Sequence, residues 1–90
     1  MKLTDKISIP AQVMARDVGG EMVILNLESG IYFGLDPVGA RIWQFIGGDK
    51  TLAEVCDAML AEYDVSREDI ERDVLSLAEA LRSQQLIGIT

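Results

Sequence analysis

The chain has no histidine and only one cysteine, Cys56, among its 90 residues. One cysteine cannot form an intramolecular disulfide, and without histidine a zinc or iron site has almost no ligand set. The longest apolar run is far shorter than the roughly 20 residues that span a bilayer. The first ten residues also lack the apolar core and cleavage site of a signal peptide. These absences predict a cytoplasmic protein with no metal, no cofactor and no membrane partner.

Proline is scarce as well, with two residues, and no low-complexity segment or linker is visible. Hydrophobic residues make up 49% of the chain, which is enough to bury a core, so disorder is not expected. The length is near the lower end of what folds alone. Residues 1–90 are therefore predicted to form a single domain.

Acidic residues outnumber basic ones, and the excess is uneven along the chain. Residues 1–50 carry five basic and six acidic side chains, whereas residues 51–90 carry three and nine, which together give the net charge of −7. An acidic second half repels phosphate backbones and anionic lipid. It favours a basic or mixed-charge peptide as a partner.

Three strands are predicted in the first half. Residues 12–18 and 21–27 are rich in β-branched and aliphatic residues and flank the pair Gly19-Gly20. A second reversal at 28–30 ends in a glycine that is free to take a positive φ, and residues 31–35 return as the third strand. A meander of three strands leaves at least one edge unpaired, which must be covered, blunted or used.

A helix is predicted to begin at Pro37, with Asp36 as its N-cap, because proline at the first helical position loses no bonded donor. It extends to about Ile46 and is ended by Gly47-Gly48. Its apolar side is predicted from the spacing to comprise Val38, Ile42, Phe45 and Ile46.

Two further helices carry recognisable N-terminal signals. Thr51 and Glu54 form a capping box, and Ser66 caps a third helix whose first turn is acidic. The apolar stripe of the second helix is Leu52, Val55, Cys56, Met59, Leu60 and Tyr63, and that of the third is Ile70, Val74, Leu77 and Leu81. The tail, residues 86–89, is predicted to be a short strand or wing. The expected fold is α+β, a three-stranded antiparallel sheet followed by three helices in a winged-helix-like arrangement.

A winged helix raises DNA binding as a first hypothesis. The third helix, however, carries three arginines against five acidic residues, and DNA affinity rests largely on basic side chains that neutralise phosphates. Nucleic acid is therefore not predicted as a partner.

The residues with reactive side chains are interpreted as structural. Cys56 lies on an apolar stripe without a cation within one turn to lower its pKa, and Trp43 is expected in the core. Tyr32 and Tyr63 lack an obvious acid–base partner. Leu75 falls ~140° around the helix from Ile70, off the core stripe, which makes it a candidate for a peptide-contacting surface. No residue set supports an enzyme, and no catalytic residue is predicted.

The segment GIYFGLDPVGARIW resembles the PqqD-like family, whose members are also called recognition elements of ribosomally made, modified peptides (RiPP recognition elements). VGGEMVILNLESG before it and DVLSLAEALRSQQLI after it are similar too, so the resemblance covers roughly residues 12–88. The quinone-synthesis branch has a Pro-Glu-Gly-like turn where residues 27–30 read Leu-Glu-Ser-Gly. Tyr-Phe-Gly-Leu and Gly-Ala-Arg-Ile-Trp look more like the small proteins of lasso peptide clusters.

The resemblance implies a non-enzymatic protein that binds the leader of a precursor peptide and presents it to modifying enzymes. The leader is expected to add a strand to the edge of the third strand, against the third helix. Strand addition takes its affinity from backbone hydrogen bonds and its specificity from pockets for alternate side chains. The implied peptide-binding residues are Ile31, Tyr32, Phe33, Gly34, Leu35 and Asp36 on the strand, and Asp69, Arg72, Asp73, Ser76, Leu77 and Ala80 on the helix.

Asp69 and Asp73 are expected to select a basic or hydroxyl-bearing leader residue. The implied partners are the leader peptide and a leader peptidase, a cyclase or a radical SAM enzyme. An alternative remains open, in which the domain is a winged-helix regulatory or assembly module. Such a module would pair through its sheet edge with itself or with another protein.

Overall fold

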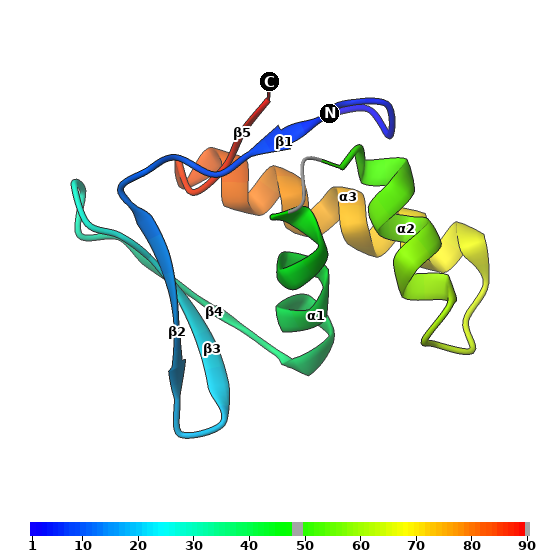
Figure 1. The fold of residues 1–90 in the computed structure, drawn as a ribbon, viewed down its shortest axis with the longest axis horizontal. Coiled ribbons are helices and arrows are strands. Elements are labelled where there is room, and N and C mark those ends of the chain that lie inside the picture. Colours follow the sequence, from blue (N-terminus) through cyan, green and yellow to red (C-terminus); the bar gives the residue numbers. More distant parts are fainter. Residues whose placement is uncertain (48–49, 90) are drawn as a thin grey trace.

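The structure, a computed structural model, describes residues 1–47 and 50–89. Its elements confirm the predicted α+β class, with a three-stranded sheet that precedes three helices (Figure 1). In chain order they are β1 (Ile7–Ser8), β2 (Val13–Val18), β3 (Glu21–Asn26), β4 (Tyr32–Leu35), α1 (Pro37–Ile46), α2 (Leu52–Leu60), α3 (Arg67–Ser83) and β5 (Gly88–Ile89).

The sheet is an antiparallel meander in the order β2-β3-β4. Gly19 and Gly20, both at positive φ, form the first turn, and Gly30, at φ 76°, completes the second as predicted. Met14, Leu25 and Tyr32 are cross-strand neighbours, so their side chains share the outer face of the sheet. Ile24 and Phe33 are paired on the opposite face, and Ile24 is fully buried. The sheet therefore has one face in the core and one toward solvent.

The helix starts follow the sequence signals. The side chain of Asp36 accepts a hydrogen bond from the backbone N–H of Gly39 at 2.7 Å. Thr51 and Glu54 form the complete capping box, and the Ser66 hydroxyl accepts from the backbone of α3. The end of α1 was assigned to Gly47-Gly48; Gly47 is its C-cap, and Gly48 lies outside the described residues.

The core joins the inner face of the sheet to all three helices. Trp43 and Cys56 are buried in it, as expected. Two predicted placements were wrong. Val38 is 39% exposed instead of facing the core with Ile42. On α3 Leu75, which was predicted to lie off the core stripe, packs partly against the core. Leu77 packs against the core as predicted but is half-buried, and Ala78 is fully buried.

The N-terminal strand was not anticipated. β1 pairs with β5, with Ile7 opposite Ile89 and Ser8 opposite Gly88. The carbonyl oxygens of Leu3 and Asp5 accept hydrogen bonds from the first turn of α2. The predicted C-terminal wing is therefore a two-stranded ribbon whose second strand comes from the other end of the chain.

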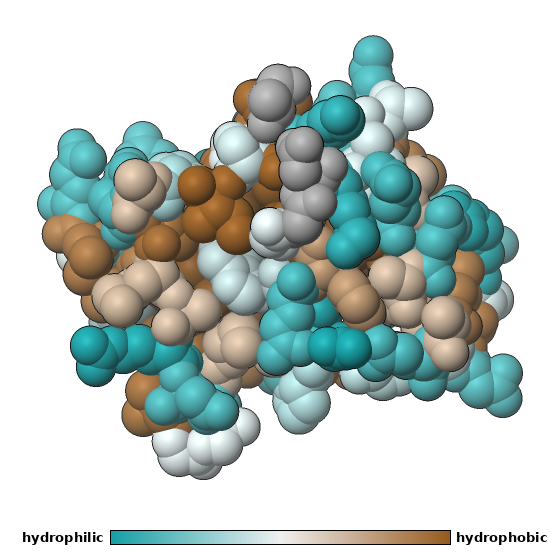
Figure 2. All heavy atoms as spheres, viewed as in Figure 1, coloured by the Kyte–Doolittle hydropathy of each residue, from teal (hydrophilic) through white to brown (hydrophobic). Residues whose placement is uncertain are grey.

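Figure 1 shows the three-stranded sheet on one side of the molecule, α2 on the other and α1 between them, while α3 runs behind α1 toward the sheet. Over the sheet, hydrophobic colours gather on the face shown in Figure 2, and hydrophilic residues predominate over α2 and the loop after it. Among the helices of residues 1–47 and 50–89, none is both long enough and apolar enough to cross a bilayer.

Candidate functional site

The edge of the sheet beside the helices is open. β4 pairs with β3 on one side, and no described residue pairs with its other side. The backbone N–H of Asn26 donates to the carbonyl of Ile31 at 2.8 Å, and bonded and non-bonded pairs alternate along an antiparallel ladder. Phe33 and Leu35 therefore bond to β3. The N–H and C=O groups of Tyr32 and Gly34 point outward from the free edge.

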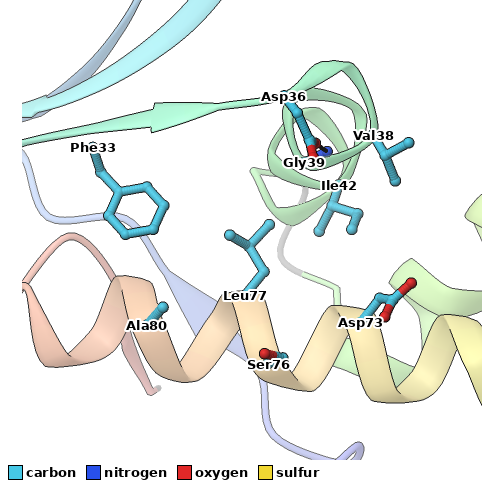
Figure 3. A pocket seen from close by; sticks show the side chains of 9 residues that line it. All are labelled: Phe33, Asp36, Val38, Gly39, Ile42, Asp73, Ser76, Leu77 and Ala80. Atoms are coloured by element: carbon cyan, nitrogen blue, oxygen red, sulfur yellow. Dashed lines mark hydrogen bonds between the residues drawn. The ribbon is translucent and has the colours of Figure 1, made fainter.

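A cleft of about 520 Å³ lies between this strand, the start of α1 and one side of α3. Figure 3 shows the ring of Phe33 extending from β4 toward α3, where Ala80 lies beneath it and Leu77 projects toward the strand. Because side chains alternate along a strand, Phe33 enters the cleft while Tyr32, 73% exposed, lies on the outer face. The cleft is therefore bounded by an unsatisfied backbone edge and by apolar side chains.

The end of the cleft nearest α1 is more polar. Asp36 and Asp73 both line it, and they come from opposite walls (Figure 3). One oxygen of Asp36 is used to cap α1, and Asp73 lies 3.6 Å from Arg72. A peptide in the cleft would meet apolar surface near Phe33 and two carboxylates near the start of α1.

The structure brings together half of the implied site residues. Those that line the cleft are Phe33, Asp36, Asp73, Ser76, Leu77 and Ala80. Those outside its lining are Ile31, Tyr32, Gly34, Leu35, Asp69 and Arg72. Leu35 is buried in the core, whereas Arg72 is exposed and bridges Asp69 and Asp73 on α3. Leu75, the candidate for a peptide-contacting surface, is not among the lining residues either.

Sequence reasoning missed one wall of the cleft. Val38, Gly39 and Ile42 of α1 line it, although none was assigned to the site. The signal was available, because Asp36 alone separates β4 from α1. The first turn of α1 must therefore lie beside the end of the strand.

Cys56 and the Arg41–Glu62 pair do not line the cleft. Cys56 is buried in α2, where burial raises the pKa of its thiol. Arg41 and Glu62 form a bidentate pair, and this hydrogen bond lowers the pKa of the Glu62 carboxyl and raises that of the Arg41 guanidinium. Within residues 1–47 and 50–89, no group of three His, Cys, Asp or Glu side chains is arranged to hold a metal ion.

The sequence of the chain matches one family model and several curated proteins. Residues 21–87 match the model of the family described as coenzyme PQQ synthesis protein D (PqqD). PqqA binding proteins from strains of Xanthomonas oryzae pv. oryzae are 32% identical over 55 residues, which is 61% of this chain and 60% of theirs. The chain thus aligns with about three fifths of the length of these curated relatives.

Two solved structures share most of the fold. TbiB1 in complex with the TbiA(beta) leader peptide is 40% identical, with a TM-score of 0.79 over 88% of this chain and 92% of that one. Lasso peptide synthetase B1 complexed with the leader peptide is 26% identical, with a TM-score of 0.81 over 92% and 98%. The predicted similarity to proteins of the lasso peptide type is confirmed by these matches. The relatives are peptide-binding proteins.

Proposed function

This chain belongs to the PqqD family, and from that membership we propose that it binds the leader segment of a ribosomally made precursor peptide. The leader adds a fourth strand to the free edge of β4 and is presented to a modifying enzyme. The observation that carries this proposal is the open edge of β4 beside a cleft whose opposite wall is α3. An extended peptide at this edge gains backbone hydrogen bonds and a pocket at the same time.

The direction of the backbone groups sets the contacts. The leader bonds to the N–H and C=O groups of Tyr32 and Gly34, because those of Phe33 belong to the β3 ladder. Gly34 carries no side chain, so a leader backbone can approach the strand closely at this position.

The cleft supplies the selectivity. Every second leader side chain points into the space beside Phe33 and Leu77, where a large apolar group is favoured. A neighbouring basic or hydroxyl-bearing residue is favoured by Asp36 and Asp73. A free leader is disordered, so part of the binding free energy is lost in ordering it, and moderate affinity with easy release follows.

The chain acts as an escort and not as a catalyst, and the chemistry is done by a leader peptidase, a cyclase or a radical SAM enzyme. This chain binds the leader in the cytoplasm, where ribosomes synthesise the precursor. Incubating the chain alone with the precursor and recording the peptide mass tests this division. An unchanged mass supports it, and a cleaved or cyclised product contradicts it. Cell fractionation tests the location.

The binding site is tested by titrating isotope-labelled protein with two synthetic leaders. One comes from the precursor encoded beside this gene, and the other is the TbiA(beta) leader bound by the 40% identical TbiB1. We expect amide shifts at residues 31–36 and along the cleft side of α3. Shifts confined to α2 or to the β1–β5 ribbon would place the peptide elsewhere and contradict the strand-addition model.

A second candidate function is favoured by the same free edges. Both β2 and β4 end the sheet without a described partner strand, so two copies can pair edge to edge. Analytical ultracentrifugation separates the two functions. A tight dimer that occupies residues 31–36 and excludes the leader supports an assembly module, and a monomer that binds leader supports the escort.

A further inference from the structure

Asn26 is a buried polar residue that does not line the cleft. The residue is 2% exposed, and among the described residues it is the sole polar one that is buried. It stands at the end of β3, where the chain turns toward β4. Burying an amide is costly unless its donors and acceptors are paired, so its partners show what it holds together.

Those partners come from two distant parts of the chain. The Oδ1 atom accepts hydrogen bonds from the backbone N–H groups of Glu28 at 2.9 Å and Ser29 at 3.2 Å. The Nδ2 atom donates to the backbone carbonyl of Gln85 at 3.1 Å. The first two bonds shape the turn that leads into β4. The third ties that turn to the residue that follows the C-cap of α3.

The two tied segments continue into the opposite walls of the cleft. Phe33 lies seven positions after Asn26 on the strand wall, and Ala80 lies five positions before Gln85 on the helix wall. At the other end of the strand, Asp36 caps α1 and holds β4 there. The strand wall is therefore held at both ends, and the hydrogen bond from Asn26 to Gln85 joins its β3 end to the residue that follows the C-cap of α3.

We propose that Asn26 is a positioning residue for peptide binding, which sets the separation between the β4 edge and α3 without touching the peptide. This inference rests on the proposed function. In the absence of the link, the strand wall swings relative to α3, and the fraction of molecules with a cleft of the right width falls. Apparent affinity falls by the same factor.

This role predicts a kinetic signature that a contact residue does not give. Loss of a positioning residue lowers the population that can accept the peptide, so the association rate constant falls and the dissociation rate constant stays nearly unchanged. Loss of a contact, as in Leu77→Ala, acts mainly on dissociation.

The test uses Asn26→Asp, which keeps the shape and the Oδ1 acceptor but loses the donor to Gln85. Stopped-flow fluorescence with the two synthetic leaders measures both rate constants. We expect about a tenfold slower association and a dissociation rate within about twofold of wild type. The matched control is Ser29→Ala in the same turn, which removes an acceptor for the N–H of Ile31 and leaves the link to Gln85 intact. It should bind like wild type.

A second measurement keeps the inference testable if Asn26→Asp folds poorly. In the free wild-type protein, one side-chain amide proton of Asn26 should exchange slowly because it is bonded to Gln85. Rapid exchange of both protons would overturn the inference. In a folded Asn26→Asp variant, relaxation dispersion at Phe33 and Ala80 should increase.

The outcomes separate the two proposals. If wild-type protein binds a leader and Asn26→Asp associates equally fast, the positioning role is wrong while the proposed function stands. If wild-type protein binds neither leader, the proposed function fails, and with it any role of Asn26 in binding. Amide exchange and relaxation dispersion would then report only on the link itself.

Discussion

Gln85 has a φ of 61°. Among the described residues, it is the one non-glycine residue with a positive φ. It follows the C-cap of α3, and the N–H groups of Gln85 and Leu86 donate to the carbonyls of Arg82 and Leu81, both at 2.9 Å. These bonds form a Schellman motif, which glycine usually completes because it has no Cβ to crowd the left-handed conformation. Leu81 and Leu86 are fully buried beneath it, so the motif is held in place.

Replacing Gln85 by glycine is therefore expected to stabilise the fold. Relief of the left-handed conformation outweighs the added backbone entropy of the unfolded chain, with a net gain of about 0.5–1 kcal/mol. Urea denaturation measures it. The control is Gln84→Gly, one residue earlier at φ −93°, which should lower stability. A lower midpoint for Gln85→Gly would show that the glutamine conformation carries little strain.

Glu54 gives the fold a pH dependence that can be assigned to one residue. The backbone N–H of Thr51 donates to its carboxylate at 2.9 Å, and this bond, followed by that with the Thr51 side chain, lowers the pKa of Glu54 below 4.5. A lowered pKa in the folded state means that the unfolded chain binds the proton more tightly. This contribution is present above pH 4.5 and is lost as pH falls through the lowered pKa.

We expect the urea midpoint to fall between pH 6 and pH 3 with a smaller slope in Glu54→Gln than in wild type. Thr51→Ala should reduce the slope too, because it weakens the capping box. In a double-mutant cycle, Glu54→Gln should have less effect in the Thr51→Ala background than in wild type. Full additivity of the two changes would mean that the Thr51 side chain does not contribute to lowering the pKa of Glu54, because the backbone N–H at position 51 is kept in Thr51→Ala.

At the scale of the element, β4 is a short strand with two chemically different edges. One edge completes the ladder to β3, and the other presents the backbone groups of Tyr32 and Gly34. Proline is tolerated on an edge strand where its missing N–H faces solvent, and it is disruptive where the N–H belongs to a ladder. Proline should therefore have different effects at neighbouring positions of this strand. At one position it should weaken peptide binding, and at the next it should destabilise the fold.

Tyr32→Pro is expected to weaken binding of the synthetic leader about tenfold or more, because it removes an outward donor and leaves the bonds to β3 intact. Stability should change little. Phe33→Pro should instead destabilise the fold, because its N–H bonds to β3. Calorimetric titration and thermal unfolding measure the two effects. Tyr32→Ala keeps the N–H, and equal losses for alanine and proline would assign the effect to the side chain.

At the scale of the whole molecule, the two ends of the chain pair with each other. β1 pairs with β5, and the N-terminal segment also bonds to the start of α2. Ile7 is 3% exposed and belongs to the core cluster that joins the sheet to the helices. The N-terminal segment thus connects the first, middle and last parts of the chain, through Leu3 and Asp5 to α2 and through β1 to β5.

Ile7→Ala is expected to lower the free energy of unfolding by about 3 kcal/mol, since it leaves a cavity in the core. The exposed neighbour Ser8→Ala should change it by less than about 0.5 kcal/mol. Chemical denaturation measures both. If both variants lose equally little free energy of unfolding, β1 is peripheral and the core is complete without it.

Local signals in the chain were sufficient for the order of the three-stranded sheet and the three helices. Asp36, Thr51 and Ser66 were assigned as helix caps, and each accepts the bond expected of it, because a cap depends on residues within one turn. The reversal at Gly30 follows from the conformational freedom of that residue. An open strand edge was also predicted, since a meander of three strands must have two edges, whereas its position beside α3 was implied by the family resemblance.

Folding in three dimensions settled what depends on residues far apart. β1 was missed because two residues carry no periodicity, and their partner lies 80 positions away. On α3 Ala78 is fully buried, whereas Leu77 is half-buried against the core and also lines the cleft. Val38 joins the same cleft, and Asn26 links its walls through Gln85. Periodicity places side chains around a helix axis, but which neighbour each one meets depends on how the elements pack.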